Sequence, residues 1–125
     1  MIKLSVEQVI AVHKMMIEKT GGSGGVRDEG LLESALNSPF QTFDGKDVYP
    51  SLLHKAAALC RGIISNHPFV DGNKRTGVHA MLIFLEINGV HLEYTQKNLI
   101  ELGLGAANGK LDSGDILVWL SEHGE

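Results

Sequence analysis

The sequence predicts an all-α protein, a compact bundle of about six helices. Leu, Ala and Ile recur at spacings of three and four residues over most of the chain, which is the period of one helix face. Aromatic residues make up only 6% of the chain, and the β-branched residues do not alternate with polar ones as they do in strands. With 125 residues, 43% of them hydrophobic, the chain has the size and composition of one globular domain over residues 1–125.

The first helix is expected to begin after Ser5. Ser5 and Gln8 have the spacing of a capping box, and apolar residues then follow with helical period as far as the glycine pair 21–22. Met15 and Met16 lie in this helix, and we expect both to fill gaps in the core.

A glycine-rich segment, 21–25, follows and is expected to be a flexible loop inside one fold. Asp28 can cap a second helix, which Pro39 should end. Residues 38–49 centre on Asp44 and Gly45, a pair typical of tight turns, and predict either an irregular flap or a short hairpin.

Two strongly apolar helices are expected at the centre of the bundle. One covers residues 51–66 and is opened by Pro50 or Ser51, and the other covers residues 73–88 and ends at Asn88-Gly89. Both are apolar around most of their circumference, which is typical of helices packed on several sides.

The C-terminal part of the chain predicts two more helices. Thr95 can cap one that runs to Leu104, and Ser113 or Asp115 can begin the last one. Trp119 in that last helix is expected to belong to the core or to an interface.

Charge and cysteine content limit the partners and the compartment. The net charge is −4 and there is no basic run, so we expect no direct binding to nucleic acid or to an anionic membrane. No segment approaches the roughly 20 apolar residues of a membrane span, and the N-terminal residues lack the apolar stretch of a signal peptide. The single cysteine, Cys60, is expected to be an inert core thiol, and we expect the protein to be cytoplasmic.

The segment between the two central helices, residues 67–75, carries the chemistry. Pro68 should end the first of these helices and leave His67 at its C-terminal end, while Gly72 and Asn73 lie where the next helix begins. The first backbone N–H groups of a helix have no partner within the helix and form an anion site.

The charged residues of this segment fit a bound polyanion. Lys74 and Arg75 lie in the first turn of the helix, where cations oppose the helix dipole unless an anion neutralises them. Asp71 can hold Mg²⁺ against phosphate oxygens, and His67 is a side-chain type suited to take a proton near neutral pH. Each residue alone is equally compatible with a structural role at a helix corner, but the combination is hard to obtain by chance.

Residues 67–75, HPFVDGNKR, resemble the signature loop of the Fic/Doc superfamily, His-Pro-Phe-x-Asp/Glu-Gly-Asn-x-Arg, at every fixed position. Residues 26–36, 55–57 and 84–89 are similar to segments of its death-on-curing (Doc) branch. The resemblance implies a small all-helical Fic fold with the loop between two central helices. For Doc relatives it implies a toxin encoded beside a small antitoxin.

The resemblance also implies roles for single residues. His67 would be the catalytic base for the target hydroxyl, Asp71 the residue near Mg²⁺, and Arg75 a catalytic clamp on nucleotide phosphates. Phe69 would anchor the loop in the core. The residues implied to bind ATP are Gly72, Asn73, Lys74 and Arg75.

Two reactions remain open from the sequence. Doc relatives transfer the γ-phosphoryl group of ATP to a threonine of elongation factor Tu, which blocks translation, whereas most Fic proteins transfer AMP. Lys74 stands where AMP transferases have a second glycine, and Doc proteins carry lysine there. Its side chain fills space beside the nucleotide and favours the kinase reaction. A catalytically silent Fic-fold binding module is the third alternative.

The remaining candidates are weaker. Arg27 is expected either to pair with an acid or to contact nucleotide or target. Residues 121–125 resemble the inhibitory helix of autoinhibited Fic proteins only in part, so we expect an antitoxin whose disordered tail folds into a groove near residues 67–75. Five scattered histidines have no metal-site spacing and are expected at the surface or in hydrogen bonds: His13, His54, His79, His91 and His123.

Overall fold

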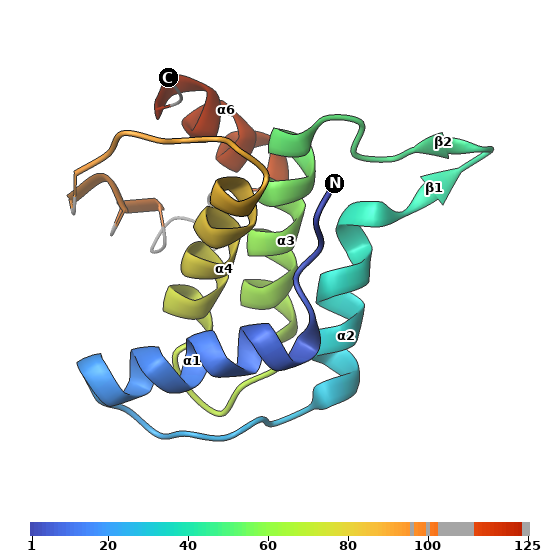
Figure 1. The fold of residues 1–125 in the computed structure, drawn as a ribbon. Helices are drawn as coiled ribbons and strands as arrows, with labels where there is room; N and C mark the ends of the chain where they lie inside the picture. The colour runs from blue at the N-terminus through green and yellow to red at the C-terminus, as the bar shows by residue number, and fades with distance from the viewer. Residues whose placement is uncertain (96, 100, 103–111, 124–125) are drawn as a thin grey trace.

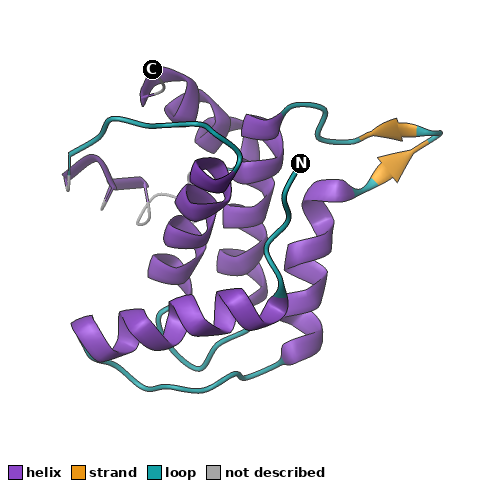
Figure 2. Cartoon of the chain, viewed as in Figure 1, coloured by secondary structure: helices purple, strands orange, loops and turns teal. Residues whose placement is uncertain are grey.

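The computed structural model describes residues 1–95, 97–99, 101–102 and 112–123, and they are mostly helical, which confirms the all-α prediction (Figures 1 and 2). Residues 97–99 and 101–102 are helical too. The elements in chain order are α1 (Val6–Thr20), α2 (Glu29–Asn37), the 3₁₀ turn η1 (Ser38–Phe40), β1 (Thr42–Phe43), β2 (Lys46–Asp47), α3 (Leu52–Asn66), α4 (Asn73–Ile87) and α6 (Ser113–His123).

The helix starts follow the local capping signals. The Ser5 hydroxyl accepts a hydrogen bond from the Gln8 N–H, and the Gln8 side chain accepts one from the Ser5 N–H, so the capping box is complete. Asp28 caps α2 through the Leu31 N–H, at 3.0 Å, and Ser51, rather than Pro50, caps α3. Each cap satisfies an N–H group that the helix itself leaves unpaired.

Within residues 38–49, residues 42–47 form a short hairpin rather than an irregular flap, and it follows the turn η1. Strands β1 and β2 pair antiparallel, with Thr42 opposite Asp47, and Asp44 and Gly45 both have positive φ in the turn. Positive φ at both central positions is the backbone of a type I′ turn, which Asp-Gly favours. The hairpin projects away from the helices (Figure 1).

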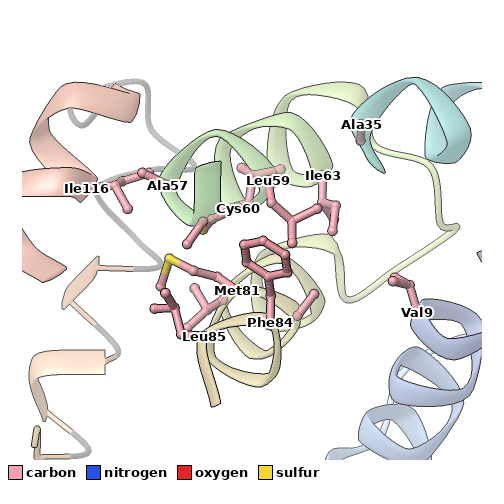
Figure 3. Packing of buried hydrophobic residues seen from close by; sticks show 14 of the residues in the cluster. Val9, Ala35, Ala57, Leu59, Cys60, Ile63, Met81, Phe84, Leu85 and Ile116 are labelled. Atoms are coloured by element: carbon pink, nitrogen blue, oxygen red, sulfur yellow. The ribbon is translucent and has the colours of Figure 1, made fainter. Parts of the chain in front are cut away.

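The core lies between α3 and α4, which run side by side (Figure 1). Figure 3 shows Met81, Phe84 and Leu85 of α4 facing α3, while Ile116 of α6 approaches from one side. Gly77 permits the close approach, because a Cβ there would lie 2.9 Å from Ile64 Cγ1 and 3.1 Å from the Cys60 carbonyl oxygen. The two helices that border the loop are therefore held rigidly together.

Helix α1 crosses the ends of α3 and α4 where the connecting loop lies, and α2 packs against α3 (Figure 1). Met16 is buried in the core, but Met15 is 46% exposed, so the expectation that both fill the core is wrong for Met15. Neighbouring residues of a helix point about 100° apart, and only one of the two can face the bundle.

The C-terminal region agrees with the sequence in part. Thr95 caps the helical residues that follow it, through the Asn98 N–H. Helix α6 begins at Ser113, one of the two predicted starts, and the Asp112 side chain caps it by accepting from the Asp115 N–H at 2.9 Å. Trp119 packs against the core, as expected. Leu104 and Glu125 lie outside the described residues.

Candidate functional site

The loop between α3 and α4 begins at His67, which ends α3 with left-handed backbone angles, φ 49° and ψ 54°. Its Nδ1 lies 2.7 Å from the Ile64 carbonyl oxygen. Because a carbonyl oxygen only accepts hydrogen bonds, Nδ1 must carry the proton, which leaves Nε2 of the neutral ring with a free lone pair. The exposed ring is thus prepared to accept a proton at Nε2.

Phe69 anchors the middle of the loop. Its side chain is 1% exposed, as the resemblance implied, and its backbone is held by the side chain of Asn73. The Asn73 amide accepts from the Phe69 N–H at 2.9 Å and donates to the Phe69 carbonyl at 3.0 Å. The Asn73 side chain is therefore used within the loop, and its backbone N–H is the group that remains for a ligand.

The segment after α1 lies along this loop (Figure 1) and is bonded to it. Val26 and Phe69 form an antiparallel bridge, and the Val70 N–H donates to the Gly25 carbonyl at 3.1 Å. A Cβ at Gly22 would lie 2.5 Å from Asp71 Oδ2, so only glycine allows this approach. The glycine-rich segment forms one wall of the site.

Arg27 holds the end of α3. Its Nε donates to the His67 carbonyl at 2.6 Å and its Nη2 to the Asn66 carbonyl at 2.9 Å. These carbonyls belong to the helix end, which has no partners of its own and carries the negative end of the dipole. Arg27 thus pairs with backbone carbonyls instead of with an acid, and it fixes the backbone of His67.

Asp71 is exposed, and its carboxylate accepts from the Ser23 N–H at 3.2 Å and the Gly72 N–H at 2.8 Å. These two hydrogen bonds lower the pKa of Asp71 below its usual value, with smaller contributions from the charges of Arg75 and His13. The carboxylate stays ionised and keeps free lone pairs.

Helix α4 begins at this point without a side-chain cap. Gly72 precedes it in the left-handed conformation, φ 77°, which glycine adopts without strain. The Thr76 N–H donates to the Gly72 carbonyl, but the N–H groups of residues 73–75 have no acceptor in the part of the chain that the structure describes. Three donors at the positive end of a helix dipole form an anion site.

The two cations in the first turn of α4, Lys74 and Arg75, differ in their hydrogen-bond partners. Lys74 is exposed and makes no hydrogen bond or ion pair with the described residues. Arg75 reaches back to the C-terminal end of α1, where its guanidinium donates to the Thr20 hydroxyl and to the Gly21 carbonyl. The Thr20 hydroxyl itself donates to the Met16 carbonyl at 2.7 Å, which leaves its oxygen facing Arg75.

One open cleft of about 570 Å³ brings the predicted residues together. All six site residues named from the sequence line it, and Ile64 and Val70 supply its apolar part. The complete lining is Ile64, His67, Val70, Asp71, Gly72, Asn73, Lys74 and Arg75.

His13, like Ser23 and Thr20, contacts the site residues although sequence reasoning did not assign it to this site. It is 3% exposed, its ring stacks on Phe69 at 3.9 Å between centroids, and its Nε2 lies 2.7 Å from the Asp71 carbonyl oxygen. His13 was expected at the surface or in a hydrogen bond, and the structure gives it the hydrogen bond, but nothing local signals a partner 58 residues away.

Cys60 and His79 lie outside the cleft. Burial raises the pKa of the Cys60 thiol to about 12, which fits an inert core thiol. Burial also lowers the pKa of His79. Among the described residues no three His, Cys, Asp or Glu side chains lie together as a metal site, and no described helix has the length and apolar character needed to cross a membrane.

The family model described as "Fic/DOC family" matches residues 3–85 of this chain. The chain belongs to the Fic/DOC family. The matched stretch includes α1, the hairpin, α3, the loop and most of α4, so the Fic/DOC assignment covers every residue of the site.

Two relatives are similar to this Fic/DOC chain. A protein of Mycolicibacterium smegmatis named "Toxin Doc" is 53% identical over 72 residues, which are 58% of this chain and 55% of that protein. A protein of Escherichia phage P1 named "Protein kinase doc" is 30% identical over 113 residues, which are 90% of this chain and 88% of that protein. The match thus spans little more than half the length of the first relative and most of the second.

Proposed function

We propose that this chain is a Doc-type toxin that transfers the γ-phosphoryl group of ATP to a hydroxyl side chain of a target protein. One observation carries the proposal: His67, Asp71 and residues 73–75 line one cleft of about 570 Å³, and the N–H groups of residues 73–75 have no acceptor among the described residues. A base beside an anion site is the arrangement that phosphoryl or nucleotidyl transfer to a hydroxyl requires.

His67 is the proposed base. The proton of the target hydroxyl passes to Nε2 while the hydroxyl oxygen forms its bond to the γ-phosphorus. The bond from that phosphorus to the bridging oxygen breaks, and its electron pair leaves with ADP. The Nδ1 bond to Ile64 and the bonds from Arg27 keep the imidazole and its backbone in place during this transfer.

Asp71 is the proposed ligand of Mg²⁺. It is ionised, exposed and has free lone pairs, and a single carboxylate that shares Mg²⁺ with substrate phosphates is usual in phosphoryl-transfer sites. When bound, Mg²⁺ would neutralise negative charge on the phosphate oxygens. The Ser23 and Gly72 N–H groups orient the carboxylate for this role.

The phosphates are proposed to bind at the start of α4. The backbone N–H groups of residues 73–75 donate to phosphate oxygens, and Lys74 and Arg75 add positive charge. For this, the Arg75 guanidinium exchanges its bonds to Thr20 and Gly21 for bonds to phosphate.

The choice of the γ-phosphoryl group is supported by Lys74 and by a relative. The exposed Lys74 side chain lines the cleft, where it would occupy space beside bound phosphates. The phage P1 relative carries the name "Protein kinase doc" and aligns over 88% of its length. AMP transfer would use the same base and the same anion site, so it is kept as the alternative outcome of the experiment.

The proposed target is a translation factor, with elongation factor Tu as the first protein to test, and its modification would block translation in the cytoplasm. The name "Toxin Doc" of the M. smegmatis relative supports a toxin. A toxin needs control, and we propose a small antitoxin whose disordered tail folds against this domain near residues 67–75.

The test is incubation of the purified protein with elongation factor Tu, Mg²⁺ and ATP labelled at either the α or the γ position. We expect label from the γ position alone, and none with a His67→Ala variant. Label from the α position would replace the kinase by an AMP transferase. Label from neither, with cell lysate as a second substrate source, would favour a silent binding module.

The antitoxin is tested by expression of the chain alone in bacteria. We expect growth arrest that a His67→Ala variant does not cause. If the folded protein is harmless at ordinary expression levels, no dedicated antitoxin is needed and this part of the proposal fails.

A further inference from the structure

His13 on α1 touches the loop on both sides of the exposed Val70. Its ring lies parallel to that of Phe69, with an interplanar angle of 7°, and its Nε2 reaches the carbonyl oxygen of Asp71. The His13 side chain is 3% exposed, so its ring is shielded from water, and its hydrogen bond to the exposed Asp71 is partly buried. His13 therefore holds the loop at two residues, Phe69 and Asp71.

The hydrogen bond has a defined direction. A carbonyl oxygen has no proton to give, so His13 Nε2 is the donor and the Asp71 carbonyl the acceptor. This bond is partly buried, and breaking it without a substitute is costly because the carbonyl then lacks its protein partner.

The Asp71 carbonyl belongs to the same peptide unit as the Gly72 N–H. A trans peptide is planar and its C=O and N–H point in opposite directions, so holding the carbonyl also aims the N–H. That N–H donates to Asp71 Oδ1 at 2.8 Å. One peptide plane thus connects the His13 imidazole to the carboxylate, and the next residue begins α4.

We infer that His13 is a positioning residue of the transfer reaction: through the Asp71–Gly72 peptide it fixes the Asp71 carboxylate and the first turn of α4 relative to His67. This inference rests on the proposed function for its catalytic consequence. The mechanical part, that His13 orders the peptide between Asp71 and Gly72, is independent of the reaction.

Two substitutions separate the hydrogen bond from the ring. His13→Phe keeps an aromatic ring to stack on Phe69 and removes the donor. His13→Gln removes the ring but places an amide N–H at a similar reach. Val9→Ala is the control for general destabilisation, because Val9 is fully buried on the same helix and is not one of the residues that line the cleft.

The first measurement is amide hydrogen exchange in the ligand-free protein. We expect the Gly72 amide to exchange faster in His13→Phe than in the parent, to be restored toward the parent in His13→Gln, and to be unaffected in Val9→Ala. Parent-like exchange at Gly72 in a folded His13→Phe protein overturns the inference, whether or not the chain transfers any group.

The second measurement is the Mg²⁺ and ATP dependence of transfer. Loss of partners that orient a metal ligand typically costs about 10- to 100-fold in affinity or activity, and we expect that range for His13→Phe in the Mg²⁺ concentration giving half-maximal rate. His13→Gln should recover most of this loss. Equal impairment of the Gln and Phe variants would assign His13 a packing role and overturn the positioning role, while an inactive parent protein would instead contradict the proposed function.

Discussion

The two ends of α3 differ in how far the polar groups around them are hydrogen-bonded. At the start of the helix, Ser51 caps the His54 N–H, and Lys55, although only 5% exposed, bonds to Asp47 and to the Tyr49 carbonyl. At the other end, the helix carbonyls are satisfied by Arg27, but the chain then enters α4 with three N–H groups unpaired in the described part of the chain. The first end is closed, and the second is open toward a cleft.

Two lysines illustrate what this difference means. Lys55 and Lys74 both lie in the N-terminal turns of their helices, where a cation opposes the dipole. Lys55 has an ion pair with Asp47 at 3.3 Å and helps to attach the hairpin to α3. Lys74 has no such partner among the described residues. This is expected of a cation that is available to bind an anionic ligand.

The largest effect should come from the open end. His67→Ala is expected to lower the transfer rate by about 10²- to 10⁴-fold, because it removes the general base. Measurement of γ-label transfer under single-turnover conditions, together with a thermal melt, tests this.

The matched control is His67→Asn. Asparagine tolerates the left-handed backbone of this position better than alanine does, so it preserves the loop while it lacks the base. Both variants should be inactive, and a transfer rate within tenfold of the parent in either would remove His67 from the mechanism.

Lys74→Gly should change the product instead of the fold. Removal of the side chain gives the nucleotide space to bind in the other orientation, so phosphoryl transfer is lost and AMP transfer can appear. Mass spectrometry of the modified target separates the two adducts. A Lys74→Gly protein that phosphorylates as fast as the parent would show that Lys74 does not select the reaction.

Lys74→Ala is the companion variant for stability. It removes a cation that opposes the dipole of α4 and should raise the free energy of unfolding by about 0.3–1 kcal/mol. Glycine at the same position should then be about 1 kcal/mol less stable than alanine.

Substitutions at the closed, N-terminal end of α3 should change the free energy of unfolding and leave the transfer rate unchanged. Lys55→Ala removes a buried ammonium group together with its hydrogen bonds to Asp47 and the Tyr49 carbonyl. This should lower the free energy of unfolding by about 2 kcal/mol. Lys55→Met gives up the ammonium group, whose Nζ lies 5.9 Å from the Phe40 ring centroid, but keeps a long apolar side chain in this buried position and should lose less. Denaturant titration measures the first effect, and an altered transfer rate per folded molecule would contradict the separation of the two ends.

The smallest effect concerns His79 of α4. Burial lowers its pKa, so the unfolded chain binds a proton more readily than the folded protein does. Stability should therefore fall as the pH drops below 6.5, the unperturbed value, and His79→Gln should remove that part of the slope. The difference between parent and variant in denaturant titrations from pH 8 to pH 5 isolates His79 from the other histidines, and a pH-independent difference would contradict the shift.

Local signals account for most of what the sequence predicted correctly. The caps at Ser5, Asp28 and Ser51 bind N–H groups three residues away, so each signal and its partner lie within one helical turn. The Asp44-Gly45 turn has the same local character. The expectation that was wrong, for Met15, concerns which of two neighbouring positions of a helix faces the bundle.

The closeness of the six predicted site residues in space also followed from the sequence. All six lie within residues 67–75, and so short a segment keeps them together. What only the tertiary structure decided is how that loop is held. Arg27 binds the His67 carbonyl across 40 residues, Ser23 binds Asp71 across 48, and His13 binds the Asp71 carbonyl across 58. No local pattern encodes such pairings, because they exist only after α1 and the segment that follows it have packed against the loop between α3 and α4.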